Sequence, residues 1–468
     1  MEEIKDECGV FGIYNHEEAP KITYLGLYAL QHRGQESCGI ASSDNNKIYY
    51  HKNLGLVSDV FKENTLSQLK GNNAVGHVRY STAGETLLKN AQPLVADYCF
   101  GSISVAHNGN LTNAVSLKDE LEENGSIFYS TSDTEIVIHL IANSRENFLV
   151  DRVIESLKKI KGAYSFLFLS EKEMIAVRDP FGFRPLVMGR LNNSMVFASE
   201  TCALDLITAT YIKDVEPGEV ILVNEEGIKS FFPFKNERKS SCVFELIYFS
   251  RPDSIFNNRS IYNLRVSMGR ELAKESRITA DIVIPVPDSG VPAAMGFAKE
   301  SGIDFEMGFT RNHYVGRTFI EPKKSIRHFG VKVKLNPVLD VIKGKRVIIV
   351  DDSLVRGTTS RKIVDMLKFA GAKEIHMRLS SPMVSSPCFY GIDTPIKEDL
   401  MASRYNEDEI NEMIGATTTK FLSLEGLGRA VGDGVNFCEA CFSGEYPQEI
   451  YDEIQSERQL KLFSKEVF

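Results

Sequence analysis

A cysteine stands near the start of the chain, in the stretch MEEIKDECGVFGI. A thiol is a nucleophile only as the thiolate, so Cys8 needs a nearby base or a lowered pKa. No Cys/His pair is apparent in the motifs, and the alternative base is a chain terminus. If residues 1–7 are a propeptide that is removed, the α-amine of Cys8, with a pKa of about 8, can accept the thiol proton. Considered alone, such a cysteine is more often a small buried core residue.

Four polar motifs follow Cys8, and together they supply what the hydrolysis of free glutamine requires. An arginine suits the α-carboxylate, an aspartate suits the α-ammonium, and an Asn amide with the next backbone N–H suits the tetrahedral oxyanion. Each motif alone also has a structural interpretation, as a helix-end charge, an ion pair, a turn or a first-turn acid. The motifs are QHRGQES (31–37), GHVRYST (76–82), HNGNL (107–111) and SDTE (132–135).

These motifs resemble those of the class II glutamine amidotransferases, which are N-terminal-nucleophile hydrolases with a four-layer αββα sandwich. The resemblance implies that Cys8 is the nucleophile and that Asn108 and Gly109 form the oxyanion hole. The implied glutamine-binding residues are Arg33, Arg79 and Asp133, of which Arg33 helps to close and order the pocket. The resemblance rests on CGVFG (8–12), QHRG (31–34), GHVRY (76–80), HNGN (107–110) and SD (132–133).

A second candidate site lies in RVIIVDDSLVRGTTS (346–360), where an apolar strand ends in two acids and a polar loop before a helix. A nucleotide-hydrolase magnesium site would need a GxxxxGK[ST] loop, which the chain lacks, and GLGRAVG (426–432) misses the third glycine of a dinucleotide fingerprint. Backbone N–H groups and hydroxyls at a helix N-terminus suit a 5′-phosphate. Asp351 and Asp352 suit the two ribose hydroxyls, directly or through magnesium.

This stretch matches the signature of the phosphoribosyltransferases. The resemblance implies that VPDSG (286–290) cradles pyrophosphate, and RNHYVGRTFIEP (311–322) resembles the mobile loop that folds over phosphoribosyl pyrophosphate in that family. One Mg²⁺ per subunit is implied, with Ser289, Asp351 and Asp352 at the metal. The implied phosphoribosyl pyrophosphate-binding residues are Asp288, Ser289, Arg356, Gly357, Thr358, Thr359 and Ser360.

The two sets of motifs together resemble the glutamine phosphoribosylpyrophosphate amidotransferase family, over residues 8 to about 447. The resemblance implies that ammonia from glutamine passes to phosphoribosyl pyrophosphate and gives 5-phosphoribosylamine, glutamate and pyrophosphate, which opens purine nucleotide synthesis. It also implies feedback inhibition by purine nucleotides and a homotetramer. A glucosamine-6-phosphate synthase would share the first half but carry sugar-isomerase domains instead of the acidic loop. A sensor that kept the fold would show damaged catalytic positions, and none is found.

Four further cysteines lie outside both candidate sites. Taken alone, CEAC (438–441) is compatible with a redox pair, half of a zinc site, or chance, and zinc usually draws its thiolates from two such knuckles. In the iron–sulfur-containing subfamily of the family just named, cysteines in the contexts SSCVFELIYFSRPDS, SPxxxxPCFYGID and CxACF bind a 4Fe–4S cluster, and all of these contexts match here. The resemblance therefore implies one cluster per subunit, held by Cys242, Cys388, Cys438 and Cys441.

The elements that must position these residues differ between the two halves. The first half mixes strands and helices; PKITYLGLYALQHRG (20–34) predicts a helix that ends near Gly34, and Ser132-x-x-Glu135 predicts a capping box at a helix start. The second half alternates strand and helix, which indicates an open parallel α/β sheet. The charged stretch 234–241 is the predicted boundary. We expect a propeptide (1–7), a glutaminase domain (8–235), a phosphoribosyltransferase domain (242–445) and a charged tail (446–468).

The composition sets the broad class. The chain has 468 residues, 43% of them hydrophobic, and a formal net charge of −9, which disfavours a nucleic-acid partner. The acidic first residues do not form a signal peptide, and no run of about 18 apolar residues predicts a membrane span. Eight irregularly spaced cysteines argue against a secreted disulfide scaffold and favour a reducing cytoplasm.

Overall fold

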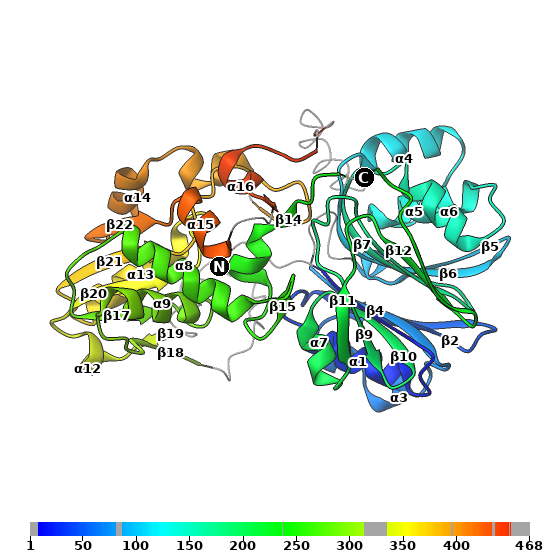
Figure 1. Ribbon diagram of the computed structural model, residues 1–468, viewed down its shortest axis with the longest axis horizontal. Coiled ribbons are helices and arrows are strands. Elements are labelled where there is room, and N and C mark those ends of the chain that lie inside the picture. Colours follow the sequence, from blue (N-terminus) through cyan, green and yellow to red (C-terminus); the bar gives the residue numbers. More distant parts are fainter. Residues whose placement is uncertain are drawn as a thin grey trace, which may run out of the picture.

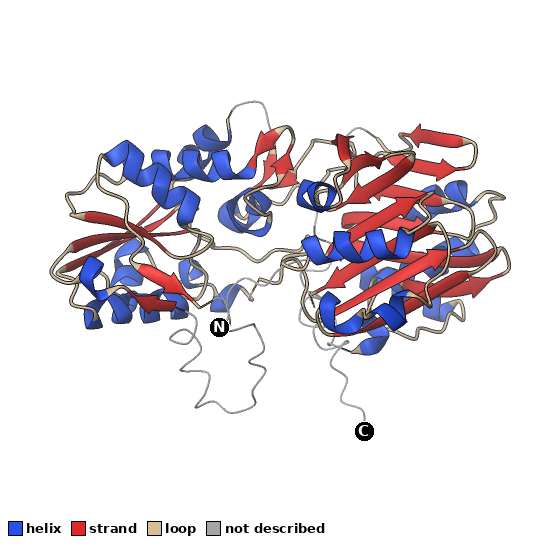
Figure 2. Ribbon diagram, turned by 90° about the horizontal axis from the view of Figure 1, so that it is seen from below, coloured by secondary structure: helices blue, strands red, loops and turns tan. Residues whose placement is uncertain are grey.

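The structure is a computed structural model that describes residues 8–80, 87–235, 237–312, 335–394, 396–432, 436–448 and 450. Figure 1 shows two lobes, one built from the first half of the sequence and one from the second. A view turned by 90° shows the same two lobes with loop segments between them (Figure 2). Among the described residues, no helix combines the length and apolar character that crossing a membrane requires.

The first lobe contains two antiparallel sheets. Within the described residues, one has the order β11-β9-β10-β1-β4-β2-β3 and the other has the order β13-β12-β8-β7-β6-β5. The strands of the first sheet are β1 (Gly9–Tyr14), β2 (Ser37–Ser43), β3 (Ile48–Leu54), β4 (Asn73–Arg79), β9 (Val187–Leu191), β10 (Ser194–Ala198) and β11 (Thr210–Asp214). The strands of the second are β5 (Leu94–Tyr98), β6 (Gly101–Leu111), β7 (Gly162–Leu169), β8 (Met174–Arg178), β12 (Val220–Asn224) and β13 (Gly227–Phe231).

Three apolar cores hold the layers of this lobe together. The middle core lies between the sheets and includes Val10, Val75, Leu167 and Phe197. A second core joins the first sheet to its helices, and a third joins the second sheet to α4, α5 and α6. The resulting helix–sheet–sheet–helix stack confirms the predicted αββα sandwich. The helices are α1 (Ala19–Ala29), α2 (Val57–Val60), α3 (Glu63–Leu66), η1 (Leu88–Asn90), α4 (Ala114–Glu123), α5 (Thr134–Asn143), α6 (Leu149–Leu157) and α7 (Thr201–Leu206).

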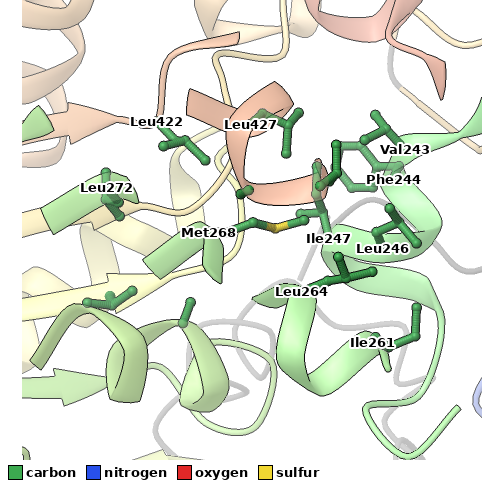
Figure 3. Packing of buried hydrophobic residues seen from close by; sticks show 14 of the residues in the cluster. Val243, Phe244, Leu246, Ile247, Ile261, Leu264, Met268, Leu272, Leu422 and Leu427 are labelled. Carbon is green, nitrogen blue, oxygen red and sulfur yellow. The ribbon is translucent and has the colours of Figure 1, made fainter. Parts of the chain in front are cut away.

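The second lobe is built on a parallel sheet with the order β17-β20-β21-β22. Its strands are β17 (Ile282–Pro285), β20 (Arg346–Asp351), β21 (Glu374–Leu379) and β22 (Thr418–Phe421). Among the described residues, two apolar clusters lie wholly within this lobe, and one of them joins the start of the lobe to α8 and α15, as Figure 3 shows. Strands covered on both faces read as continuous apolar runs, and the predicted open parallel α/β sheet is confirmed.

Helices and short elements complete the second lobe. The helices are α8 (Ile261–Glu275), α9 (Val291–Ser301), α12 (Leu339–Ile342), α13 (Thr358–Phe369), α14 (Glu407–Ile414), α15 (Leu424–Val431) and α16 (Ala440–Ser443). The short strands are β14 (Ser241–Cys242), β15 (Ile255–Phe256), β16 (Arg259–Ser260), β18 (Phe309–Arg311), β19 (Leu335–Pro337) and β23 (Phe437–Cys438). A π-helical turn, η2 (Glu245–Phe249), and two 3-10 turns, η3 (Lys397–Asp399) and η4 (Met401–Ser403), complete the set.

Two local predictions in the first lobe were wrong. Helix α1 ends at Ala29 rather than near Gly34, and the side-chain oxygen of Gln31 then accepts a hydrogen bond from the Val57 backbone N–H. The predicted capping box does not form at α5, because Asp133 is the N-cap residue. The Glu135 carboxylate instead accepts hydrogen bonds from the preceding loop, at the backbone N–H groups of 129 and 130.

Candidate functional site

Cys8 lies directly before β1, a central strand of the first sheet. The thiol is buried, and its Sγ lies 3.6 Å from the carbonyl oxygen of Tyr80. The register pairs Gly9 with Val78, so Cys8 lies level with Arg79 at the end of β4. The predicted nucleophile and one predicted carboxylate ligand therefore occupy adjacent strand ends.

The guanidinium of Arg33 is part of a buried charge network beside Cys8. Its Nε donates to the Cys8 carbonyl oxygen at 3.1 Å, and its Nη1 donates to Glu200 at 2.6 Å. Arg33 also makes two hydrogen bonds, of 2.6 and 3.0 Å, to Glu245. Burial alone would raise the pKa of Glu200, but the charges of His32 and Arg33 hold it far below its ordinary value. The glutamine-binding role of Arg33 stays a prediction, and the contacts described here are with the protein.

Asn108 and Gly109 lie on β6, in the second sheet. Both polar atoms of the Asn108 amide are buried and lack a hydrogen-bond partner within the described part of the chain. A buried polar group without a partner is costly, which is typical of a group held ready for a ligand. Gly109 has a φ of 147°, and a Cβ there would lie 2.0 Å from the Ala163 carbonyl oxygen, so only glycine fits.

Two histidines brace this strand. The Nε2 of His77 donates to the carbonyl oxygen of His107 at 2.8 Å, which joins β4 of the first sheet to β6 of the second. Burial lowers the pKa of His77 to about 3, so its ring is neutral. The ring of His107 stacks on Phe166, and its Nδ1 lies 3.0 Å from the Thr134 hydroxyl.

Asp133 approaches the end of the same strand from the start of α5. Its Oδ2 accepts a hydrogen bond from the backbone N–H of Leu111 at 3.0 Å, and its Oδ1 lies 3.7 Å from Nδ1 of His107. Burial alone would raise the pKa of Asp133, but His107 and the hydrogen bonds outweigh burial and lower it. The carboxylate is therefore ionised at neutral pH and suits an ammonium group.

The second candidate site lies where β17 and β20 end side by side. The backbone N–H of Val286 donates to the Val350 carbonyl oxygen, and a Cβ at Gly290 would lie 2.5 Å from that same oxygen. The loop that contains Asp288 and Ser289 therefore packs against the end of β20, next to Asp351. Such loops at the carboxyl ends of parallel strands are where α/β sheets bind ligands.

Asp351 and Asp352 are buried at the end of β20. The backbone N–H of Asp352 and the hydroxyl of Ser353 fix the two carboxylates, by donating to Asp351 and Asp352 respectively. The predicted phosphate-binding residues follow at once: Gly357 is the N-cap residue of α13, and Thr358, Thr359 and Ser360 form the first turn. Free N–H groups at a helix start favour a phosphate.

Two cationic side chains at this site pair with acids of the protein. Arg356 contacts Asp399 at 3.4 Å, and Arg311 pairs with Asp288. The predicted mobile loop (311–322) falls mostly outside the described residues, which resume at 335. The predicted propeptide (1–7) and all but residues 446–448 and 450 of the predicted tail also lie outside them.

The four predicted cluster cysteines gather where the two lobes meet. Strands β14 and β23 pair in parallel, with Cys242 opposite Cys438, and Cys441 follows on α16. The Cys441 carbonyl oxygen accepts hydrogen bonds from the backbone of residues 385 and 386, just before Cys388. Burial, followed by the charges of the three other cysteines, raises the pKa of Cys441 well above its ordinary value.

A single metal ion has no ready-made site in the described part of the chain. No group of three or more His, Cys, Asp or Glu side chains there is placed to hold one ion. A four-iron cluster differs, because each thiolate binds a different iron and the sulfurs need not converge on one point. Magnesium also differs, because it commonly uses one or two carboxylates together with substrate phosphates and water. Both proposed groups are therefore chemically compatible with their residues.

The loop of residues 388–391 connects these cysteines to the proposed oxyanion strand. The Asn110 side-chain amide donates to the Phe389 carbonyl oxygen at 2.9 Å, and Arg184 donates to the Tyr390 carbonyl oxygen at 2.8 Å. The Tyr390 ring stacks on Phe183, and a Cβ at Gly391 would lie 3.0 Å from the carbonyl carbon of Gly109. The second lobe therefore packs directly against β6.

Sequence reasoning missed the residues that join the lobes, above all Glu245, Arg184 and Glu200. A weak signal existed for Glu245, which is a single acid inside the apolar run VFELIYF (243–249). Buried charges are rare without a partner, so such an acid predicts an ion pair. The partners, however, are separated from it by dozens to hundreds of residues, and no spacing rule identifies them.

Comparisons with known proteins match both halves of the chain. A glutamine amidotransferase domain model matches residues 77–206, and a phosphoribosyl transferase domain model matches residues 256–380. Amidophosphoribosyltransferase 1, chloroplastic, of Arabidopsis thaliana is 55% identical over 95% of this chain and 79% of that protein. Amidophosphoribosyltransferase of Bacillus subtilis is 51% identical over 96% of each chain. The second domain match excludes the sugar-isomerase alternative for this half.

Solved structures agree over nearly the whole chain. The structure of glutamine phosphoribosylpyrophosphate amidotransferase from B. subtilis, complexed with ADP and GMP, matches with a TM-score of 0.91 at 51% identity. That match covers 95% of this chain and 98% of the other. A structure described as the allosteric regulatory enzyme of purine biosynthesis matches with a TM-score of 0.92, also at 51% identity, and covers 95% of this chain and 97% of the other.

Proposed function

The chain belongs to the amidophosphoribosyltransferase family, and from this premise we propose which of its residues perform each half of the reaction. The enzyme catalyses the glutamine-dependent step that opens purine biosynthesis. We assign glutamine hydrolysis to the site around Cys8 and Asn108. We assign the conversion of phosphoribosyl pyrophosphate to 5-phosphoribosylamine to the site around Asp351 and Asp352.

In the glutaminase half, removal of residues 1–7 frees the α-amine of Cys8, which accepts the thiol proton. The thiolate attacks the side-chain amide carbon of glutamine and forms a tetrahedral oxyanion. The Asn108 amide and the Gly109 N–H donate to that oxyanion, the C–N bond breaks, and ammonia leaves with the proton. Water then hydrolyses the thioester to glutamate and returns the thiol. Arg79 binds the α-carboxylate and Asp133 the α-ammonium of the substrate.

The single observation that best supports the glutaminase half is the buried amide of Asn108. Its two polar atoms have no partner among the described residues, whereas Nε2 of His77, Nδ1 of His107 and the Asp133 carboxylate are hydrogen-bonded. Stabilisation of a transient oxyanion requires a donor that has no other partner. The Asn108 amide is such a donor, and His77 joins its strand to the strand beside Cys8. Such a donor costs no rearrangement when the charge develops.

In the second half, ammonia attacks C1 of the ribose, the C1–O bond breaks, and pyrophosphate leaves. The start of α13, with Arg356, Gly357 and the hydroxyls of residues 358–360, binds the 5′-phosphate. Asp288 and Ser289 border the pyrophosphate, and Asp351 and Asp352 hold the ribose hydroxyls. Mg²⁺ bound at Ser289, Asp351 and Asp352 would offset the negative charge of the pyrophosphate leaving group. The buried, strand-end position of the two aspartates supports this assignment.

Ammonia passes between the two sites through a path shielded from water, which prevents its protonation and loss. The direct packing of residues 388–391 against β6 supports such an enclosed junction. A 4Fe–4S cluster held by Cys242, Cys388, Cys438 and Cys441 has a structural role, because no electron transfer occurs in the reaction. The convergence of these four segments supports the proposed cluster.

Further assignments concern regulation, subunit assembly, compartment and domain boundaries. Purine nucleotides act as feedback inhibitors, since a structure 51% identical to this chain is described as a complex with ADP and GMP. The enzyme is a homotetramer in the cytoplasm, with residues 8–235 and 242–445 as its two domains and 446–468 as a charged tail. The sparse, irregular cysteines support a reducing compartment.

Two measurements on purified enzyme test the proposal. Intact mass of active protein should show a chain that begins at Cys8. Cys8→Ser should abolish glutamine-dependent synthesis and leave ammonia-dependent synthesis, because the ribose site is separate. Glutamine-dependent activity in Cys8→Ser, or full activity in a chain that retains residues 1–7, would show that the assignment is wrong.

A further inference from the structure

We propose that Glu245, in the second lobe, is a positioning residue for the glutaminase site in the first lobe. The inference rests on the proposed role of Cys8 and extends it to a residue beyond the predicted boundary at 234–241. Glu245 acts through Arg33, whose Nε holds the carbonyl oxygen of Cys8. The nucleophile is thus oriented by a carboxylate of the other lobe.

The contacts of Glu245 connect the two lobes directly. The side chain is fully buried and accepts hydrogen bonds from Arg33 at 2.6 and 3.0 Å and from Arg184 at 3.2 Å. The Ser250 hydroxyl donates to the same carboxylate at 2.9 Å. Both arginines belong to the first lobe and are buried. Charge-assisted hydrogen bonds to a carboxylate in a buried setting are strong and directional, so they fix the guanidinium of Arg33.

The backbone around Glu245 is rigidly anchored. Val243, Phe244, Leu246 and Ile247 are buried in an apolar cluster with α8 and α15, and Figure 3 shows these side chains packed together. Arg265 on α8 donates to the carbonyl oxygens of Leu246 at 2.9 Å and of Ser250 at 2.7 Å. The carboxylate therefore projects from a segment whose neighbours are held on both sides.

Arg33 transmits this anchoring to Cys8. The arginine bridges Glu245 in one lobe and Glu200 in the other, and its remaining Nε–H donates to the Cys8 carbonyl oxygen. Loss of the Glu245 charge would leave two buried arginines facing one fewer carboxylate. Arg33 would then shift toward Glu200, and Cys8 would lose a fixed donor. Misplacement of a reacting group by about 1 Å can lower a rate by about 10²-fold.

The test compares Glu245→Gln and Glu245→Asp with Glu219→Gln. Glu219 is the matched control, because it is also fully buried and paired, but its hydrogen bonds are with Lys213, Glu216 and Ser230. Each variant is assayed for glutamine-dependent and ammonia-dependent synthesis. The rate of Cys8 alkylation by 6-diazo-5-oxo-L-norleucine, a glutamine-like electrophile, reports the nucleophile directly. The melting temperature reports any general loss of stability.

We expect Glu245→Gln to lower kcat with glutamine and the alkylation rate together, by about tenfold or more. Ammonia-dependent synthesis and the KM for phosphoribosyl pyrophosphate should stay near wild type. Glu245→Asp, which keeps the charge, should recover part of the loss, and Glu219→Gln should leave all four quantities unchanged. In an Arg33→Lys background, Glu245→Gln should have little further effect, because residues that act through one contact are not additive.

Equal losses of glutamine- and ammonia-dependent activity in Glu245→Gln would overturn the inference, as would an unchanged alkylation rate. If Glu245→Gln does not fold, Glu245→Asp decides, and wild-type glutamine kinetics there would equally overturn it. Wild-type enzyme and Cys8→Ser, measured in the same assay, distinguish failure of the proposed role of Cys8 from failure of the proposed role of Glu245. Failure of the proposed function appears as glutamine-dependent activity in Cys8→Ser, whereas failure of this inference leaves that control inactive.

Discussion

Single residues at the two proposed sites differ in how their polar groups are satisfied. The Asp133 carboxylate is tied to the Leu111 N–H, and the Asp352 carboxylate to the Ser353 hydroxyl. The Asn108 amide is buried with neither polar atom bonded among the described residues. The two carboxylates proposed to bind the ground-state substrates are thus held by hydrogen bonds from the protein. The group that meets a transient charge has no competing partner, so it can donate fully when the oxyanion forms.

Asn108→Ala removes one proposed oxyanion donor. We expect kcat with glutamine to fall by roughly 10²–10³-fold, because the lost hydrogen bond exists only in the transition state. The KM for glutamine and the ammonia-dependent rate should change little. Steady-state kinetics with both nitrogen donors measure this, with the exposed Asn124→Ala as a control. A rise in KM with unchanged kcat would place Asn108 in ground-state binding instead.

Asp352→Asn tests the ribose site. Both glutamine- and ammonia-dependent synthesis should fall together, because both use the same activated ribose. The KM for phosphoribosyl pyrophosphate should rise and should respond to the magnesium concentration. Asp340→Asn, an exposed acid in the same lobe, serves as the control. A loss confined to the glutamine reaction would mean that Asp352 serves communication between the sites rather than substrate binding.

At the scale of elements, local sequence patterns predicted those strands and helices whose apolar periodicity and bounding turns lie in one short segment. The apolar strand predicted before the two acids is β20, and the helix predicted after the polar loop is α13. Long-range placement was beyond such patterns. The position of the 388–391 loop against β6 depends on pairing between segments almost 300 residues apart, and no local propensity encodes it. The predicted capping box does not form because the Glu135 carboxylate accepts a hydrogen bond from the preceding loop instead, at the backbone N–H of Tyr129.

Gly391→Ala tests the contact between that loop and the oxyanion strand. Gly391 has a φ of 102°, and an added Cβ would lie 3.0 Å from the Gly109 carbonyl carbon, so β6 or the loop must shift. Glutamine-dependent synthesis should therefore fall more than ammonia-dependent synthesis. Gly344→Ala is the matched control, with a φ of 74° and no atom within 4 Å of the added Cβ. Equal effects of the two variants on the glutamine reaction would contradict the proposal that the loop of residues 388–391 holds the oxyanion strand β6 in place.

At the scale of the whole molecule, hydrogen bonds from segments far apart in the sequence join the two lobes. The segment that leads into the second lobe, residues 240–242, runs alongside residues 181–183 of the first lobe. The backbone N–H groups of Ser240 and Cys242 donate to the carbonyl oxygens of Phe181 and Phe183. Near the end of the described chain, the Gln448 side chain accepts from the Gly162 N–H of the first lobe. The four proposed cluster cysteines all belong to the second lobe, so a bound cluster would join the start of that lobe to its C-terminal segment beside these contacts.

The proposed cluster predicts a specific metal content. Protein purified without oxygen should be brown and contain about four irons per chain. Cys438→Ala should lose iron and melt at a lower temperature, whereas Cys38→Ala, a buried thiol outside the set, should keep the iron. Metal analysis and calorimetry measure both effects. Colourless wild-type protein with full activity and zinc or no metal would refute the cluster.

Transfer of nitrogen from the first lobe to the second can be followed with an isotope label. Wild-type enzyme receives phosphoribosyl pyrophosphate, glutamine labelled with ¹⁵N in its side-chain amide, and unlabelled ammonium, and the trapped 5-phosphoribosylamine is analysed by mass spectrometry. We predict product that carries ¹⁵N well above the proportion in free ammonia, and unlabelled product from Cys8→Ser. Wild-type product with the isotope ratio of the solution, or labelled product from Cys8→Ser, would contradict the account.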